Sequence, residues 1–245
     1  GLILSTLINK NYQGGFGIIK GWFFDPLLFS FILIHKIKDL KDIENILKTF
    51  YFSAFVVSLV AIEYFFYGHL SYDGRLSAFW SSPNYLAMFL APAIFIGIYI
   101  LKSNKQKTKS KNITMIFSLA IVAFIIYLTH SYSTWISIFL GLLIIELITK
   151  KINTKNIIIF SLVISLFLLA QINNPKIKEV FSERSSLNSR ITIWKSSALM
   201  IKNNFFLGIG PGNFQNKYLE YQKYFPPYLE WAVPQPHNMF LAFWL

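Results

Sequence analysis

Long apolar runs alternate with short polar loops along most of the chain. The runs lie at residues 22–35, 50–67, 84–101, 112–129, 134–149 and 156–172, and another begins at residue 238. Most of them approach the roughly 20 residues that a helix needs to cross the core of a bilayer. The pattern therefore predicts an all-α fold, a polytopic integral membrane helix bundle. Because the chain begins and ends in apolar stretches, we expect it to be part of a longer membrane protein.

One interval between apolar runs, residues 173–237, is much longer than the others and carries signs of order. The segment "NSRITIWKSSALMIK" predicts an amphipathic helix that begins at an N-cap, either Asn188 or Ser189. The apolar residues that would share one face of this helix are Ile191, Trp194, Ala198 and Ile201. We expect the helix to lie in or on the membrane interface.

The segment "NNFFLGIGPGNF" follows this helix and places three glycines, Gly208, Gly210 and Gly212, around a proline, which predicts a tight turn. We expect residues 1–245 to form a single membrane domain. Its parts are transmembrane spans with short loops over residues 1–172, a large extracytoplasmic loop with amphipathic helices over residues 173–237, and the start of a further span over residues 238–245.

Composition agrees with a membrane protein and excludes several other classes. The chain is 54% hydrophobic and only 14% charged, with a mean hydropathy of +0.48, whereas soluble domains carry about 25% charged residues. The chain has no cysteine, which excludes disulfides and thiolate metal sites. The carboxylates show no metal-ligand spacing, so we expect neither a metal nor another cofactor.

The net charge of +12 is distributed as a membrane topology signal. One set of alternate loops contains 12 lysines in 30 residues, whereas the opposite set contains three basic residues in 33. The lysine-rich loops are 36–49, 102–111 and 150–155. They face the cytoplasm by the positive-inside rule, which places residues 173–237 outside. We therefore expect a lipid bilayer, and no nucleic acid, as the partner of this charge.

Arginine is confined to the extracytoplasmic side of this topology. The chain has 20 lysines but only three arginines, which are Arg75, Arg184 and Arg190. A guanidinium can hold phosphate oxygens in a bidentate manner and keeps its charge. Three arginines on one side therefore favour an anionic group at the outer leaflet as a ligand. Anchoring to lipid headgroups is the alternative interpretation.

Three of the four histidines also lie on this side, and these are His69, His130 and His237. A histidine near its usual pKa of about 6.5 can accept a proton from a hydroxyl at neutral pH. His237 is the best placed of them, because Pro234 and Pro236 stiffen its approach and Asn238 can cap the helix that follows. A surface position without chemistry is the alternative for an interfacial histidine.

Three segments that share this side carry a family resemblance: "GRLSAFWSSPNYLAMFL", "SRITIWKSSALMIKNNFFLGIGPGNF" and "PHNMFLAF". The first has a Gly-Arg followed by Pro-Asn. The second has an Arg-x-x-x-Trp helix followed by the glycine turn, and the third has a His-Asn that leads into a span. In these segments and their order the chain resembles the O-antigen ligase/polymerase-related family of bacterial envelope glycan enzymes. The resemblance implies a multi-span glycosyltransferase in the bacterial inner (cytoplasmic) membrane, with its active face outside.

The resemblance further implies transfer or polymerisation of a glycan from an undecaprenyl-diphosphate-linked donor to a lipid-core, glycan or protein acceptor. Arg75 and Arg190 would hold the donor diphosphate, His237 would activate the acceptor, and Asn238 would support it. The scheme requires no metal. Trp194 lies four residues after Arg190 and can stack on its guanidinium, with anchoring in the membrane interface as the alternative.

One position departs from the family pattern, because relatives often carry an arginine after a serine where this chain has Tyr132. Arg184 and His130 are candidate substitutes for that contact to the donor, so we predict both as substrate-binding residues. A membrane transporter or permease, as some relatives have been labelled, is an alternative function. It predicts charged or broken helices at mid-span, where Pro92 is the main candidate. A structural or lipid-binding membrane protein is a third possibility.

Overall fold

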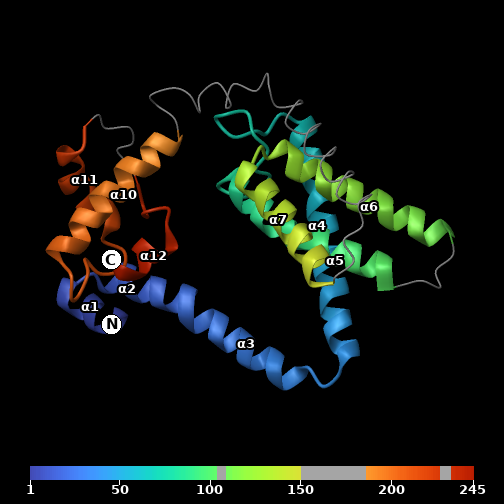
Figure 1. Cartoon of the computed structure of the whole chain (residues 1–245), viewed down its shortest axis with the longest axis horizontal. Helices are drawn as coiled ribbons and strands as arrows, with labels where there is room; N and C mark the ends of the chain where they lie inside the picture. The colour runs from blue at the N-terminus through green and yellow to red at the C-terminus, as the bar shows by residue number, and fades with distance from the viewer. Residues whose placement is uncertain (104–108, 150–185, 227–232) are drawn as a thin grey trace. The chain divides into compact units, whose positions relative to one another are not determined.

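The structure is a computed structural model that describes residues 1–103, 109–149, 186–226 and 233–245. These residues form helices, turns and loops, and no strand occurs among them. The chain divides into two compact units, and Figure 1 shows the helices of both. We call residues 37–163 the bundle unit, and residues 1–36 together with 164–245 the split unit. The all-helical structure confirms the predicted fold class.

Four helices form the described part of the bundle unit. They are α4 (Leu40–Phe66), α5 (Pro83–Ser103), α6 (Lys109–Leu128) and α7 (Tyr132–Ile148). Asp39 caps α4, because its side chain accepts a hydrogen bond from the backbone N–H of Asp42 at 2.9 Å. Pro83 begins α5, a position where the missing N–H of proline costs no helical hydrogen bond.

The connections of the bundle unit gather at its two ends. At one end the loop of residues 67–82 is joined to the end of α6, where the N–H of Leu76 donates to the carbonyl of Leu128 at 3.1 Å. At the other end the Tyr99 hydroxyl donates to Glu44 at 3.5 Å. The sequence predicts the first of these bonds on the outer side of the membrane and the second on the cytoplasmic side.

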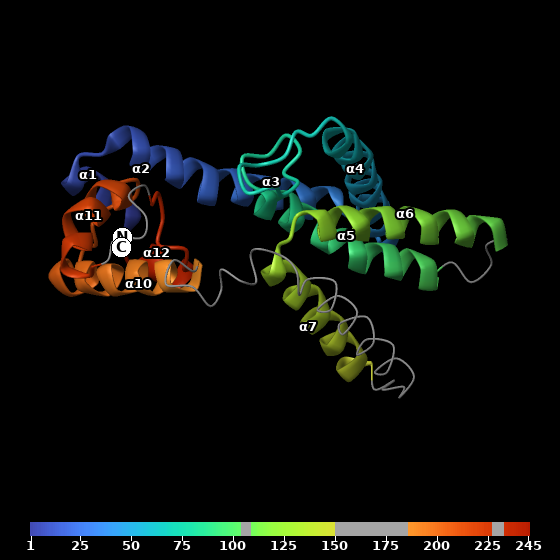
Figure 2. The same cartoon turned by 90° about the horizontal axis from the view of Figure 1, so that it is seen from above.

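The core of the bundle unit consists of small and branched apolar side chains from all four helices. α5 packs against α4, α6 and α7, and Figure 2 shows α5 and α6 lying side by side. Fully buried members of the core include Ala54, Leu76, Leu86, Leu90, Val122, Ile125 and Ile126. Leu76 belongs to the loop of residues 67–82, so the core also holds this loop in place.

The split unit combines the first and the last helices of the chain. They are α1 (Leu2–Asn9), α2 (Tyr12–Ile19), the π-helical turn η1 (Lys20–Phe24), α3 (Asp25–Lys36), α10 (Ser186–Asn203), α11 (Phe214–Tyr221), the 3-10 turn η2 (Gln222–Tyr224) and α12 (Met239–Trp244). α2, η1 and α3 continue one another as a helix of 25 residues. α10 packs against α11, η2 and α12.

The predicted amphipathic helix is present as α10, but its predicted start is wrong. α10 begins at Ser186, so neither Asn188 nor Ser189 is its N-cap. The predicted apolar face is also not the face that packs inside the unit, since Ile191 is 37% exposed. The buried residues of α10 are Ser189, Ile193, Ser196, Ser197 and Met200. Buried serines are tolerated on a helix because a hydroxyl can bond to the preceding turn, as Ser197 does to the carbonyl of Ile193 at 2.8 Å.

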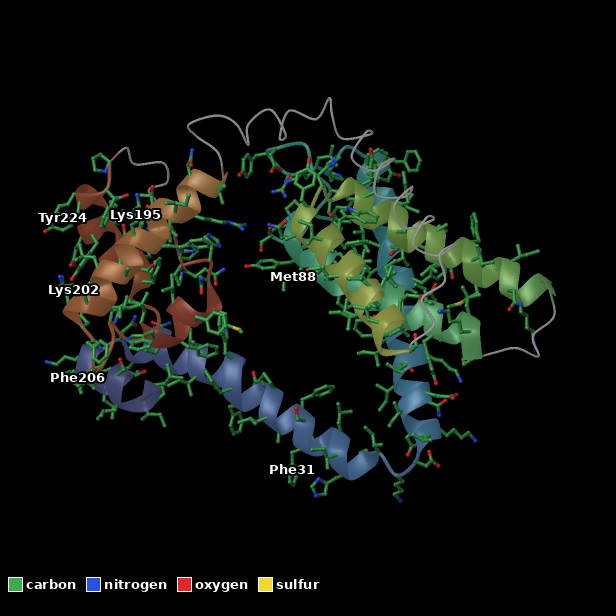
Figure 3. The ribbon with its side chains drawn as sticks, viewed as in Figure 1. Phe31, Met88, Lys195, Lys202, Phe206 and Tyr224 are labelled. Atoms are coloured by element: carbon green, nitrogen blue, oxygen red, sulfur yellow. The ribbon has the colours of Figure 1, made fainter. Side chains whose placement is uncertain are left out.

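Four helices are long and apolar enough to cross a membrane, and these are Tyr12–Lys36, Leu40–Phe66, Pro83–Ser103 and Ser110–Leu128. The first two begin ten residues earlier than the predicted runs, and the other two begin one or two residues earlier. The shorter α7 is also apolar. Apolar side chains such as Phe31 and Met88 are exposed on these helices, as Figure 3 shows. The predicted run at 156–172 lies outside the described residues.

Candidate functional site

The predicted site residues occur in both units. Arg75 and His130 lie in the bundle unit, whereas Arg190, Trp194, His237 and Asn238 lie in the split unit. Arg184 lies outside the described residues. Each unit contains a cluster of polar groups.

In the bundle unit, Arg75 is held by two side chains. Its Nε donates to Oδ2 of Asp73 at 2.5 Å, and its Nη1 donates to Oδ1 of Asn84 at 3.4 Å. The side chains of Arg75 and Asp73 are only 12% and 28% exposed. The guanidinium is therefore fixed along the edge that carries Nε, and the Arg75 side chain is largely sheltered from water while Asp73 stays partly exposed.

The backbone around Arg75 is fixed as well. The N–H of Ser71 donates to the carbonyl of Arg75 at 2.8 Å, which closes a turn through Gly74 at φ +74°. A glycine occupies this left-handed conformation without the steric cost of a Cβ. The next residue, Leu76, is fully buried. The turn and the core thus hold the Arg75 backbone from both sides.

Asp73 is ionised under ordinary conditions in this environment. Burial alone would raise its pKa, but the Ser71 hydroxyl and the positive charge of Arg75 outweigh burial and hold the pKa below its usual value. The Ser71 oxygen lies 2.5 Å from Oδ1 of Asp73 and 2.8 Å from the carbonyl of Arg75, and its one hydrogen can serve either acceptor. Asp73 is therefore a charged partner of Arg75 throughout the neutral pH range.

The connection between α6 and α7 contributes the other polar groups at this end of the bundle unit. His130 has a left-handed backbone with φ +47°, which is uncommon for a residue with a side chain. Its ring lies 5.7 Å from the ring of Tyr127. Tyr132, at the position where the resemblance predicts an arginine in relatives, interacts electrostatically with Arg75.

In the split unit, a hydrogen bond connects α10 to the segment that carries His237. The Trp194 indole Nε1 donates to the carbonyl of Pro236 at 3.1 Å. Arg190 lies four residues before Trp194 on the same helix and is exposed. Residues four apart are neighbours on a helix surface, so Arg190 lies one turn from the bonded indole.

His237 occupies a strained position at the start of α12. It is exposed, and its backbone has φ +49°. Pro236, which precedes it, is buried, and Asn238, which follows it, is half-buried. Asn238 caps α12 as predicted, because its Oδ1 accepts from the N–H groups of Phe240 at 2.9 Å and Leu241 at 3.2 Å. A left-handed residue that is not glycine persists only where its surroundings determine it, and such positions are frequent at functional sites.

The predicted glycine turn is confirmed and packs against the first two helices. Gly208, Gly210 and Gly212 all have positive φ angles. The Asn11 side chain donates from Nδ2 to Oδ1 of Asn213 at 2.8 Å, and the Ser5 hydroxyl donates to the carbonyl of Leu207 at 2.6 Å. The turn thereby connects α10 to α1 and α2.

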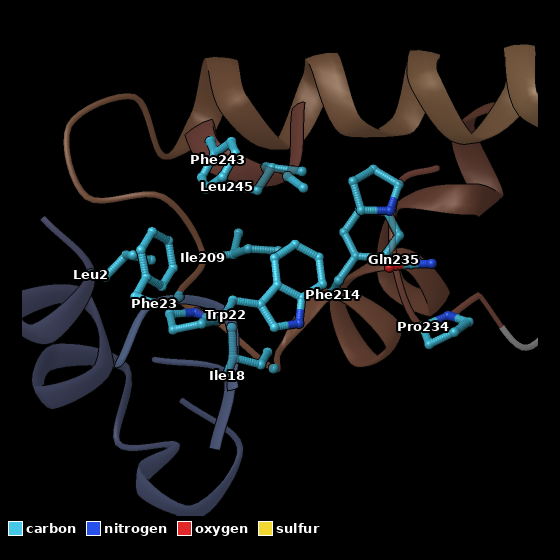
Figure 4. A pocket seen from close by; sticks show the side chains of 15 residues that line it. Leu2, Ile18, Trp22, Phe23, Ile209, Phe214, Pro234, Gln235, Phe243 and Leu245 are labelled. Atoms are coloured by element: carbon cyan, nitrogen blue, oxygen red, sulfur yellow. The ribbon is translucent and has the colours of Figure 1, made fainter. Parts of the chain in front are cut away.

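A partly open apolar cavity of about 130 Å³ lies between these elements (Figure 4). Ile18, Trp22 and Phe23 line it from the helix of residues 12–36, which is long and apolar enough to span a membrane. Other lining residues are Ile209, Phe214, Pro234, Pro236 and Phe243. The cavity therefore extends from a candidate membrane span to the prolines that precede His237.

Sequence reasoning missed two members of the Arg75 cluster, Asp73 and Asn84. The segment "YDGR" did contain a signal, because Asp-Gly is typical of a turn that folds the chain back on itself. Asn84 belongs to the Pro-Asn pattern, which by itself does not indicate a contact with Arg75. Within the described ranges, no group of three or more histidine and carboxylate side chains could hold a metal ion.

The apolar helices and the clusters of arginine, histidine and asparagine define an integral membrane protein with two polar sites. A family model described as O-antigen ligase matches residues 117–245, which is more than half of the chain. The chain therefore belongs to the O-antigen ligase family. The match includes Tyr132, Arg190, Trp194, His237 and Asn238, whereas Arg75 precedes it.

One similar protein of named activity is the ComP-specific O-oligosaccharyltransferase of Acinetobacter baylyi. It is 26% identical over 188 residues, which cover 74% of this chain and 33% of that protein. The chain thus spans about a third of the length of this relative. No solved structure matches the chain.

Proposed function

We propose that the full-length protein is a membrane glycosyltransferase that uses an undecaprenyl-diphosphate-linked glycan as donor. It transfers or polymerises the glycan on a lipid-core, glycan or protein acceptor, at the outer face of the cytoplasmic membrane. Membership of the O-antigen ligase family supports the reaction class. The observation that carries the proposal is the Trp194–Pro236 hydrogen bond, because it connects the helix of Arg190 to the segment of His237.

The reaction requires a cation for the leaving group and a base for the acceptor. The acceptor oxygen attacks the anomeric carbon of the glycan, and the bond from that carbon to the diphosphate oxygen breaks. The lipid diphosphate leaves with the electron pair, and His237 takes the proton of the acceptor hydroxyl. A positioned guanidinium stabilises the charge that grows on the leaving oxygens more than it stabilises the bound donor.

Arg190 binds and stabilises the donor diphosphate, and Trp194 holds the His237 segment through Pro236. Asn238 fixes the start of α12 and with it the backbone of His237. Arg75 supplies a further guanidinium for the donor phosphates, and His130 and Arg184 remain candidate substrate contacts. No step of this scheme uses a metal.

The apolar cavity of the split unit is suited to hydrocarbon. It is lined by Trp22 and Phe23 of a candidate membrane span and by Pro236, the residue before His237. We assign it to part of the isoprenoid chain of the donor, because a chain that enters from the bilayer would bring its diphosphate towards the proposed base. The A. baylyi relative, named as an O-oligosaccharyltransferase, agrees with transfer to an oxygen.

The test uses the full-length protein in membranes, supplied with a lipid diphosphate-linked glycan and an acceptor. Released lipid diphosphate and glycan product are both measured. We expect Arg190→Lys to lower the rate by about 10²-fold, since lysine keeps the charge but loses the bidentate fork. Lys202→Gln is the matched control, because it removes an exposed charge from the same helix (Figure 3) and should leave the rate unchanged.

Two results would contradict the proposal. If Arg190→Lys and His237→Ala both keep the wild-type rate, the assigned roles are wrong even though the family is right. If the wild-type protein forms no product with any of several donors and acceptors, the transporter alternative becomes the better one, and ion flux into liposomes is then measured.

A further inference from the structure

The Arg75 cluster has a feature that the proposed function does not use, which is a carboxylate in direct contact with a guanidinium. Asp73 accepts from Nε of Arg75 at 2.5 Å. A negative charge beside a phosphate-binding arginine weakens the attraction of that arginine for an anionic donor. A site built only for affinity would omit Asp73, so its presence requires another explanation.

The contact differs from an ordinary surface ion pair because its arginine side chain is largely buried. Exposed pairs contribute little because water screens them and both side chains lose freedom. Here Arg75 is only 12% exposed and Asp73 only 28%. The Ser71 hydroxyl and the turn through Gly74 hold the carboxylate on its other side. Asp73 is therefore itself oriented, and it can transmit that orientation to Arg75.

The orientation leaves part of the guanidinium available for a ligand. Arginine has five N–H groups in a planar fork. Within the residues that the structure describes, Asp73 takes the hydrogen on Nε and Asn84 takes one on Nη1. Three hydrogens remain, one on Nη1 and two on Nη2, and these two nitrogens form the terminal edge of the fork, which can bind phosphate in a bidentate manner.

We propose that Asp73 is a positioning residue for the glycosyl transfer, which fixes the Arg75 fork in the orientation that meets the donor diphosphate. This inference rests on the role given to Arg75 in the proposed function. Asp73 does not touch the donor and acts only through Arg75. The Asp73 carboxylate weakens the binding of the intact donor. It nevertheless raises the rate of glycosyl transfer, because an Arg75 side chain that is already oriented stabilises the leaving diphosphate without rearranging.

This division of effects predicts a specific kinetic pattern for Asp73→Asn in the full-length protein. Asparagine can still accept a hydrogen bond but carries no charge. We expect kcat to fall by about tenfold or more, because a small misplacement of a reacting group is costly. The KM for the lipid diphosphate donor should stay unchanged or fall, because the repelling charge is gone. A residue that only stabilises the fold would lower the amount of folded protein and leave kcat per folded molecule unchanged.

The double variant Asp73→Asn with Arg75→Lys tests whether Asp73 acts through Arg75. If it does, the double variant loses no more kcat than Arg75→Lys alone, because the two residues form one unit. Glu220→Gln is the matched control, since it breaks an exposed ion pair with Lys217 at 2.9 Å on α11 and is not one of the predicted site residues. It should change neither kcat nor KM.

The outcomes separate this inference from the function on which it rests. If Arg75→Lys lowers kcat and Asp73→Asn does not, the positioning role is overturned and the transferase function stands. Additive losses in the double variant would also overturn it. If Arg75→Lys has the wild-type kcat while Arg190→Lys is impaired, the role of Arg75 fails and this inference fails with it.

Binding of farnesyl diphosphate to each purified variant gives an independent readout. The Asp73→Asn variant should bind this probe at least as tightly as the wild type does, and weaker binding would contradict the charge argument.

Discussion

The indole N–H of Trp194 donates to the carbonyl of Pro236 at 3.1 Å, across 42 positions of sequence. The bond connects the middle of α10 with the residue that precedes His237. Pro236 is buried, so its carbonyl has few other partners available, and an unpaired buried carbonyl is costly. The tryptophan of the Arg-x-x-x-Trp pattern therefore has a structural role that connects the two halves of the predicted site in the split unit.

Replacing Trp194 by phenylalanine tests this connection. An aromatic ring is retained, but the N–H that donates to Pro236 and the five-membered part of the indole are both lost, so we expect the free energy of unfolding to fall by about 1–2 kcal/mol. Glycan transfer should slow by more than this small loss of stability explains, because the His237 segment is then less well held. Unfolding in mixed micelles and the rate of product formation are measured side by side.

Trp80→Phe is the control for this substitution. The Trp80 ring packs against Phe79 and Phe89 in the bundle unit. It is not one of the predicted site residues, and its replacement should leave the rate of transfer unchanged. Equal effects of the two replacements on the rate would show that the Trp194 hydrogen bond has no special importance.

His237 combines a chemical role with a strained backbone, and two substitutions separate these properties. Asparagine tolerates the left-handed conformation, so His237→Asn should keep the stability of the wild type and lose about 10²-fold or more in rate with the proposed base. His237→Ala should lose the same rate and in addition about 1 kcal/mol of stability, because alanine is strained at φ +49°. An active His237→Asn variant would exclude proton transfer by this residue.

The sequence predicted those parts of the split unit that depend on local backbone chemistry. The glycine turn was predicted because glycine adopts positive φ angles easily, and all three glycines have them. The cap at Asn238 was predicted because an asparagine before an apolar run accepts from the first free N–H groups of a helix. Both features need only neighbouring residues, so a short segment contains all the information.

The features that were missed or predicted wrongly depend on contacts between distant segments. The packed face of α10 contains Ser196 and Ser197, which periodicity of apolar residues cannot detect. The Trp194–Pro236 bond joins parts of the chain that only the fold brings together. Asp73 was missed because its contact with Arg75 depends on how the turn of residues 71–75 orients the two side chains. The prediction that residues 173–237 form an outer loop remains a prediction.

Gly212 is required by both its conformation and its surroundings. It has φ +83°, and an added Cβ would lie 2.9 Å from the Asn11 side chain and 3.1 Å from the Gly14 backbone. We expect Gly212→Ala to lower the free energy of unfolding by about 1–3 kcal/mol. Gly17→Ala is the control, because its Cβ would meet nothing within 4 Å, and helix propensity predicts a gain of up to about 1 kcal/mol. Similar losses in both variants would contradict the packing of the turn against α2.

The lowered pKa of Asp73 predicts how its contribution to stability depends on pH. The charged group that faces Asp73 is the Arg75 guanidinium, which also interacts electrostatically with Tyr132. The Ser71 hydroxyl donates a hydrogen bond to the Asp73 carboxylate. Because the folded pKa is depressed, the stabilisation is complete above the ordinary value of about 3.9 and is lost as the pH falls through the lower folded value. The wild type should therefore have a higher Tm than Asp73→Asn at pH 7, and the difference should shrink below about pH 4. A difference that grows in acid would contradict this assignment of the ionised state.

The absence of cysteine from the chain provides a direct test of its orientation. Tyr72 lies in the loop of residues 67–82 and is fully exposed, and Lys38 lies in the lysine-rich loop between α3 and α4. A membrane-impermeant maleimide added to intact spheroplasts should label Tyr72→Cys and leave Lys38→Cys unlabelled until the membrane is opened. Each variant is placed in the full-length protein with any cysteines elsewhere removed. Labelling of Lys38→Cys alone would show that the topology is the reverse of the predicted one. His237 would then lie on the cytoplasmic side, where a donor and an acceptor outside the membrane could not reach it.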